Sequence, residues 1–196
     1  QTRCFNNFNL YFTLAKLFMS KIFKIKTSSL FTNNLTNIED SVDLFGYFQS
    51  KEFLESCKKE FLEINEIIPN TSKSFYSENC LTIHFRWGDS NWAKLNQEYY
   101  DKIINLAHNY KEIIIVTDDI NMAKFKFKSI DNLKFNISRT VLEDFTILRN
   151  SSNLACAPST FSWWAAQLSS SCKTVYMSKF IFNKLGHYSS SNLELI

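Results

Sequence analysis

Apolar residues recur with helical spacing in the first third of the chain. At residues 8–23 and again at 52–68 they return every three or four positions with polar residues between them, which predicts two amphipathic helices. The polar, turn-rich stretch at residues 27–40 predicts a loop, and residues 71–79 predict a linker. We therefore expect an N-terminal lobe over residues 1–75.

Strand and helix patterns then alternate through the remaining part, residues 76–196. Short apolar runs such as IIIV at residues 113–116 predict strands that are buried on both faces. This alternation predicts an α/β domain in which helices cover both faces of a parallel sheet. The predicted strands are residues 81–85, 112–117, 133–137, 153–157 and 174–177, and the predicted helices are residues 97–109, a short helix from 120, 142–150 and 160–168.

The hydrophobic content, the net charge and the cysteines indicate which classes of protein fit this chain. The 196 residues are 45% hydrophobic, which supports a packed core. The net charge of +3, from 22 basic and 19 acidic residues, is too balanced for a nucleic-acid-binding surface. The basic run AKFKFK at residues 123–128 is better explained as a solvated helix face. The five cysteines are far apart and odd in number, which favours isolated buried thiols over a metal cluster.

The segment HFRWGD at residues 84–89 spans the carboxyl end of the strand predicted at residues 81–85. Ligands of a parallel sheet bind beyond the carboxyl ends of its strands, so Arg86 is a candidate ligand-binding residue. Its planar guanidinium suits a phosphate or a diphosphate. A salt bridge between Arg86 and Asp89 that tightens the loop explains the same residues. Gly88 permits a backbone turn.

A second candidate segment, APSTFS, begins the predicted helix at residues 160–168. Ser159 is the predicted N-cap of this helix. The free N–H groups of the first turn, together with its hydroxyl groups, can bind an anion. An ordinary capped helix is the alternative. The residues of this candidate anion site are Ser159, Thr160, Phe161 and Ser162.

Three carboxylates complete the set of candidates. Asp118 and Asp119 follow a predicted strand, where a carboxylate accepts hydrogen bonds from a ribose or a base, or else caps the next helix. Capping is the expectation for at least one of the two. Asp144 lies in the first turn of its helix and is either a favourable charge there or a ligand contact.

The order of these motifs resembles that of the alpha-1,2-fucosyltransferases, glycosyltransferase family 11. LFGYFQSKEFLE at residues 44–55 resembles an element that precedes a helix in this family, and residues 6–16 resemble the family's opening motif. Trp87 stands where the family has a second arginine. The ordered motifs that carry the resemblance are HFRWGD, YYDKII, IIIVTDD and DFTILRNSSNLACAPSTFSWWAAQL.

The resemblance implies a GT-B-like fold with a Rossmann-like C-terminal lobe and a reduced N-terminal lobe. It implies transfer of fucose from GDP-fucose to a galactoside hydroxyl of a glycan or lipopolysaccharide-type acceptor, with inversion and with neither a bound metal nor another cofactor. It also implies a membrane-associated protein. A bacterial protein would be bound peripherally at the cytoplasmic face of the membrane, and a eukaryotic one would lie in the Golgi lumen.

Carried over by position, Arg86 would grip the diphosphate, His84 would support the nucleotide and Asp144 would lie near the nucleoside. The residues from Ser159 to Ser162 would close around the phosphates. The general base would be Asp89 or a carboxylate of the N-terminal lobe. Trp87 and the shortened N-terminal lobe suggest an alternative, a catalytically inactive nucleotide-binding or structural remnant. The enzyme hypothesis requires Arg86 and the helix start at Ser159 to converge on one site.

Overall fold

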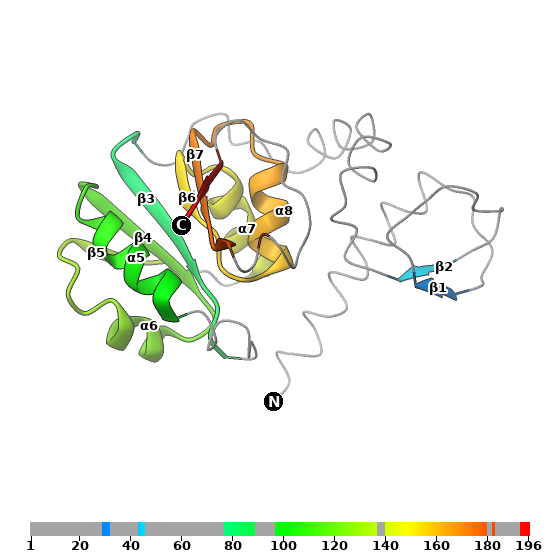
Figure 1. Ribbon diagram of the computed structural model, residues 1–196, viewed down its shortest axis with the longest axis horizontal. Helices are drawn as coiled ribbons and strands as arrows, with labels where there is room; N and C mark the ends of the chain where they lie inside the picture. Colours follow the sequence, from blue (N-terminus) through cyan, green and yellow to red (C-terminus); the bar gives the residue numbers. More distant parts are fainter. Residues whose placement is uncertain are drawn as a thin grey trace. The chain divides into compact units, whose positions relative to one another are not determined.

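The computed structural model divides the chain into two compact units, Gln1–Ile68 and Pro69–Ile196, which are described separately (Figure 1). The helices predicted at residues 8–23 and 52–68 lie outside the described residues, and the boundary predicted between residues 75 and 76 stays a prediction. In the described part, no helix has the length and apolar character needed to cross a bilayer. Described in full are residues 77–88, 97–136, 140–179, 182 and 193–196, and the backbone is described for residues 29–31 and 43–45.

The first unit contains two short paired strands. β1 (Ser29–Phe31) lies parallel to β2 (Asp43–Phe45), with Leu30 opposite Leu44. The loop predicted for residues 27–40 is therefore wrong at the three residues of β1. A strand this short shows too little alternation to be recognised, because its hydrogen bonds depend on a partner distant in sequence.

The second unit is built on one parallel sheet of six strands, in the order β5-β4-β3-β6-β7-β8. The chain starts at the centre with β3, moves outward through β4 and β5, then crosses to the other side of β3 and continues outward through β6, β7 and β8 (Figure 1). This is the doubly wound, Rossmann-like arrangement, and it confirms the predicted fold class. The strands are β3 (Cys80–Phe85), β4 (Glu112–Thr117), β5 (Leu133–Phe135), β6 (Asn153–Ala155), β7 (Thr174–Met177) and β8 (Leu193–Leu195).

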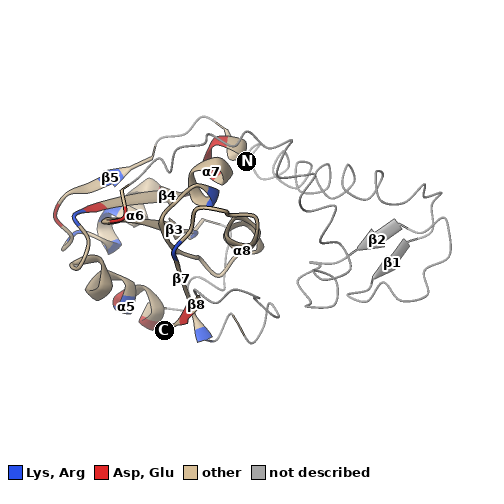
Figure 2. Cartoon of the chain, turned by 90° about the horizontal axis from the view of Figure 1, so that it is seen from above, with Lys and Arg blue, Asp and Glu red and all other residues tan. Residues whose placement is uncertain are grey.

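Helices cover both faces of this sheet, as Figure 2 shows for α5 on one side and for α7 and α8 on the other. The side chains of β3 alternate between the two faces. Phe85 packs edge-on against Tyr100 of α5, with 4.9 Å between ring centroids, whereas His84 faces Phe161 of α8 at 5.6 Å. The helices are α5 (Gln97–Ala107), α6 (Ile120–Lys126), α7 (Val141–Arg149) and α8 (Thr160–Gln167).

Tyr99 ties α5 to the sheet. The single proton of its buried hydroxyl lies between two carbonyl oxygens, that of Cys156 directly after β6 (2.8 Å) and that of Tyr176 in β7 (3.0 Å). A buried carbonyl without a partner is costly, so this hydroxyl helps to fix the carboxyl edge of the sheet. That edge is where the candidate site residues lie.

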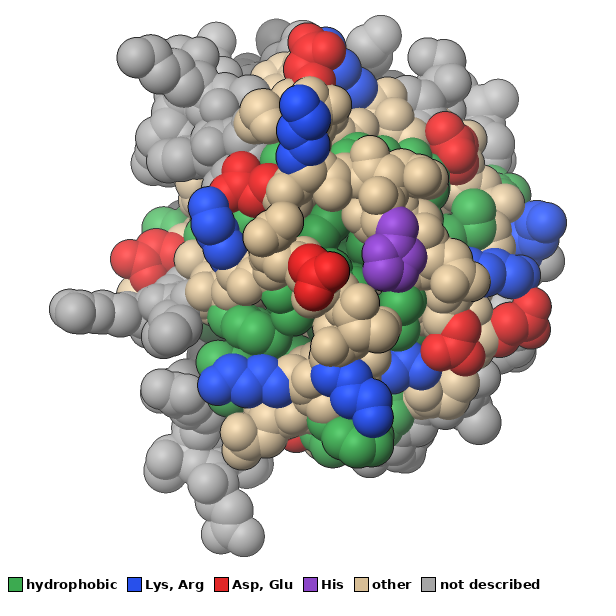
Figure 3. All heavy atoms as spheres, turned by 90° about the vertical axis from the view of Figure 1, so that its left-hand side faces the viewer, with side chains coloured by type: hydrophobic (Ala, Val, Ile, Leu, Met, Phe, Trp, Pro, Cys, Tyr) green, Lys and Arg blue, Asp and Glu red, His purple; other side chains and the backbone are tan. Residues whose placement is uncertain are grey.

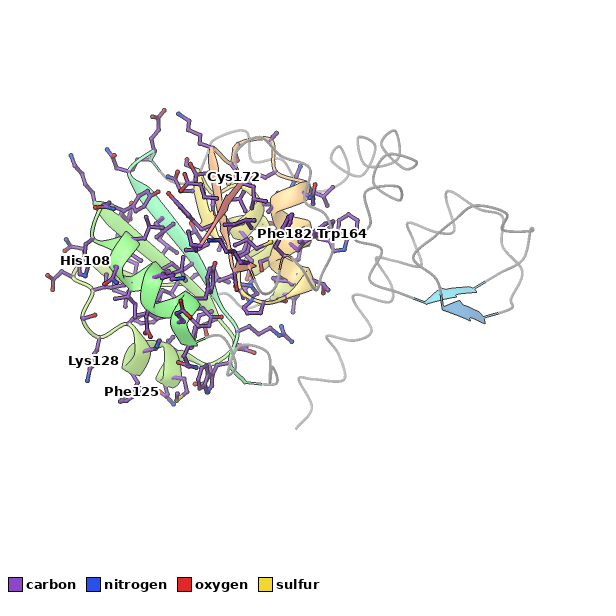
Figure 4. The ribbon with its side chains drawn as sticks, in the orientation of Figure 1. His108, Phe125, Lys128, Trp164, Cys172 and Phe182 are labelled. Atoms are coloured by element: carbon purple, nitrogen blue, oxygen red, sulfur yellow. The ribbon has the colours of Figure 1, made fainter. Side chains whose placement is uncertain are left out.

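The basic run at residues 123–128 lies on α6 and its C-cap. Phe127 is fully buried in the core, while Phe125 is 66% exposed. Figure 4 shows Phe125 and Lys128 at the outer margin of the unit, where the Lys128 ammonium lies 5.4 Å from the Phe125 ring centroid. The prediction of a solvated helix face is confirmed. On the face shown in Figure 3, basic and acidic side chains are interspersed, in keeping with the nearly balanced charge.

Candidate functional site

The two candidate phosphate-binding segments follow neighbouring strands. β3 pairs in parallel with β6, with Thr82 opposite Leu154 and Ile83 opposite Ala155. β3 leads to Arg86, and β6 leads to the N-terminus of α8. The chain leaves β3 toward one side of the sheet and β6 toward the other, so the gap between their carboxyl ends is the topological switch point. Ligands of doubly wound folds bind at this place.

Arg86 lies on the same side of the sheet as α8. The rings of Phe85 and Trp87 stack on one another, 5.6 Å apart and 17° from parallel, so both lie on the α5 side. Because successive side chains alternate, Arg86 between them projects to the side of His84. His84 in turn contacts Phe161 in the first turn of α8. The structure thus brings His84 against the start of α8, and the alternation of side chains places Arg86 on the same side of the sheet.

Ser159 and Ser162 shape the first turn of α8. Ser159 is the N-cap, as predicted, and its Oγ accepts a hydrogen bond from the Phe161 N–H at 3.2 Å. The Ser162 hydroxyl is fully buried and donates to the Ala157 carbonyl at 3.2 Å. Ser162 therefore supports the turn from inside, and its expected place among the residues that close around the phosphates stays a prediction.

Thr160 and Phe161 occupy the first two positions of α8. Thr160 is half-buried, and its hydroxyl makes no hydrogen bond to any residue in the described part of the chain. Phe161 is buried between His84 and Phe145 of α7, with 5.3 Å between the centroids of the two phenylalanine rings. Within this turn, the Thr160 hydroxyl and the proton of the Ser159 hydroxyl make no hydrogen bond to any described residue, so both are available to a ligand. Phe145 escaped the sequence analysis because its helix showed only a general amphipathic pattern.

His84 is a buried, neutral histidine. Burial, and secondarily the charge of Arg86, lower the pKa of His84 to about 3. Nδ1 of His84 is buried and has no hydrogen-bond partner within the described residues. The ring is therefore uncharged near neutral pH, and its Nδ1 is a buried polar atom without a hydrogen-bond partner among the described residues.

The depressed pKa of His84 predicts a loss of stability in mild acid. Between about pH 6.5 and pH 3 the unfolded chain binds a proton at His84 that the native protein does not, so stability falls as the pH falls. From pH 7 to pH 5 this linkage amounts to about 2 kcal/mol. Urea unfolding at both pH values should show a smaller loss for His84→Gln than for the native protein. Equal losses would contradict the buried neutral state.

Asp118 and Asp119 perform different tasks. The carboxylate of Asp119 caps α6 by accepting the Met122 N–H at 3.0 Å, so capping by one of the two aspartates is confirmed. Asp118 accepts hydrogen bonds from the N–H groups of Trp87 at 2.8 Å and Gly88 at 3.3 Å. Its oxygens hold the turn after β3, whereas a contact with ribose or base was expected.

Gly88 lies close to the Asp118 carboxylate. A Cβ at this position would lie 3.3 Å from Oδ2 of Asp118, and the backbone of Gly88 is not in the left-handed region. The sequence analysis attributed this glycine to a turn conformation that side chains resist. The structure replaces that explanation with a steric one.

Asp144 connects α7 to the end of β5. Its Oδ1 accepts a hydrogen bond of 3.2 Å from Nδ2 of Asn136, the residue that follows β5. Thr140 and Glu143 form a capping box that fixes the start of α7. Asn136 was not among the predicted site residues, because the strand predicted at residues 133–137 included it, whereas β5 ends at Phe135. Asp89 lies outside the described residues, so its pairing with Arg86 stays a prediction.

Two known proteins are similar to this chain in sequence. The chain is 26% identical over 187 residues to an alpha-1,2-colitosyltransferase of Escherichia coli, covering 85% of this chain and 62% of that protein. It is 26% identical over 165 residues to the O-antigen biosynthesis glycosyltransferase WbnK of Escherichia coli, covering 70% of this chain and 54% of that protein. No family model matches the chain, and no solved structure matches it.

The fold and these similarities support a glycosyltransferase. The chain spans less than two thirds of the length of either relative. The two relatives bear different names, so the similarities do not select one particular sugar.

Proposed function

We propose that this chain carries the nucleotide-sugar-binding lobe of a glycosyltransferase that moves fucose from GDP-fucose to a galactoside hydroxyl. The observation that supports the proposal is the contact of His84 at the end of β3 with Phe161 in the first turn of α8, across the switch point between β3 and β6. One relative is named as an alpha-1,2 transferase and the other as an enzyme of O-antigen biosynthesis. The second name supports a lipopolysaccharide-type acceptor.

In this proposal, Arg86 binds the diphosphate through two parallel hydrogen bonds and offsets the negative charge that grows as GDP leaves. The free N–H groups at the start of α8 add donors on the same face. The Ser159 hydroxyl accepts the Phe161 N–H and still has its own proton to donate, and the Thr160 hydroxyl adds another donor. His84 and Asp144 support the nucleotide and the nucleoside.

The proposed reaction is an inverting displacement that uses no metal. The acceptor hydroxyl attacks the anomeric carbon of fucose while the bond from that carbon to the diphosphate oxygen breaks. The acceptor's proton passes to a general base, Asp89 or a carboxylate of the N-terminal lobe. The lobe at residues 1–75 would bind the acceptor, and the protein would associate peripherally with a membrane.

Trp87 favours a second candidate, an inactive nucleotide-binding or structural remnant. Its ring stacks on Phe85 on the α5 side, in the place of the second arginine that the resemblance leads one to expect. The site therefore has one positive charge fewer than an arginine there would give it.

Calorimetric titration with GDP, paired with an assay of GDP release from GDP-fucose, tests both candidates. The transferase predicts GDP binding and a release rate that rises when a galactoside acceptor is added. GDP binding without acceptor-dependent release favours the inactive nucleotide-binding module. Absence of both GDP binding and release would refute the transferase and point to a structural remnant.

A further inference from the structure

Asp118, which follows the neighbouring strand β4, accepts two hydrogen bonds from the turn after β3. These two hydrogen bonds are called the clamp. Register places Phe85 opposite Thr117, so Asp118 follows β4 at the level of Arg86. Asp118 Oδ1 accepts the Trp87 N–H at 2.8 Å, and Oδ2 accepts the Gly88 N–H at 3.3 Å. Two successive backbone donors thus point at one carboxylate, with one oxygen for each.

We propose that Asp118 is a positioning residue that fixes the turn of Arg86, Trp87 and Gly88 so that the Arg86 guanidinium faces the diphosphate. The proposal rests on the nucleotide-binding function proposed above. In this proposal Asp118 acts by positioning Arg86 and makes no contact of its own with the sugar nucleotide.

The geometry of Trp87 supports this role. Its N–H is held by Asp118 and its ring is held by stacking on Phe85, so both the backbone and the side chain of Trp87 are anchored. The hydrogen bond from the Trp87 N–H to Asp118 fixes the peptide plane between Arg86 and Trp87. Rotation of Arg86 away from α8 would require breaking the hydrogen bond, because backbone and side-chain direction are coupled in an extended segment.

Gly88 provides an independent sign of the same clamp. A methyl group at Gly88 would lie 3.3 Å from Oδ2 of Asp118, which is closer than most contacts of this type. The nearest atoms to that methyl group all belong to the Asp118 side chain. The cost of adding a side chain at Gly88 should therefore depend on whether Asp118 is present.

A double-mutant cycle on Gly88 and Asp118 tests the clamp. Each of Gly88→Ala and Asp118→Ala should weaken GDP affinity about 5-fold, whereas Gly88→Ala in the Asp118→Ala background should add less than about 2-fold. Asp118→Asn should fall between native and Asp118→Ala, because its amide keeps one acceptor oxygen. The matched control is Asp119→Ala, which removes the α6 cap and should lower the melting temperature without changing GDP affinity.

Additive effects in this cycle, or native GDP affinity in Asp118→Ala, would overturn the proposal. If the native protein binds no GDP, the proposed function fails, and amide hydrogen exchange then tests the clamp by itself. Trp87 and Gly88 should exchange at least about 10-fold faster in Asp118→Ala than in the native protein, since both amides lose their acceptor. Unchanged exchange at both amides would overturn the clamp whatever the nucleotide result.

Discussion

Arg86→Ala is expected to lower GDP affinity and acceptor-dependent GDP release at least about 100-fold while leaving the fold intact. Arg86 lies at the carboxyl edge, after the last residue of β3, and is half-exposed, so its side chain does not fill the core. Its removal takes away the guanidinium that the proposal places on the diphosphate. Calorimetry gives the affinity, a coupled GDP assay gives the rate, and far-ultraviolet circular dichroism checks the fold.

Two further variants make this test specific. Arg86→Lys keeps the charge but loses the planar fork, so an intermediate loss is expected. Lys111→Ala removes one positive charge at the opposite, amino edge of the sheet, directly before β4, and should leave GDP affinity unchanged. If Arg86→Ala and Lys111→Ala release GDP from GDP-fucose at the native rate, Arg86 has no role in donor binding.

The strands and helices of the second unit were predictable because their signals are local. An apolar run such as IIIV and a turn such as the one before Thr160 are visible within a few neighbouring residues. The strand order was not predictable, since pairings such as Ile83 with Ala155 join residues far apart in the chain. β8 was missed because its three residues, LEL, are too few to show a pattern.

The difference between local and long-range contacts also explains which parts of the candidate site could be predicted. Asp119 caps a helix by accepting from Met122, three residues ahead, and a sequence rule anticipates this contact. Asp118 binds an N–H that lies 31 residues away in the chain, and no local rule foresees it. The sequence thus identified Asp118 as a polar residue at the right edge of the sheet, but only the fold shows which partner occupies its carboxylate.

Arg149 is a charged residue that is buried within the described part of the chain. It lies in the last turn of α7, where a basic residue ordinarily projects into solvent, yet its side chain is only 1% exposed. Its Nε donates a hydrogen bond of 2.9 Å to the carbonyl of Leu168, the C-cap residue of α8. Burial lowers the pKa of the Arg149 guanidinium. This side chain therefore joins the C-terminal ends of the two helices that carry the candidate site.

Arg149→Ala is expected to lower the free energy of unfolding by about 3 kcal/mol, because it leaves a cavity and deprives the Leu168 carbonyl of a donor. Arg149→Met fills most of the volume and should recover part of that loss. The exposed ion pair of Lys173 with Glu78 provides the control, and Lys173→Ala should cause no measurable change. Urea unfolding at pH 7 measures all three variants. If Arg149→Ala is as stable as Lys173→Ala, the buried arginine does not hold α7 against α8, and the start of α8 must be positioned by the sheet alone.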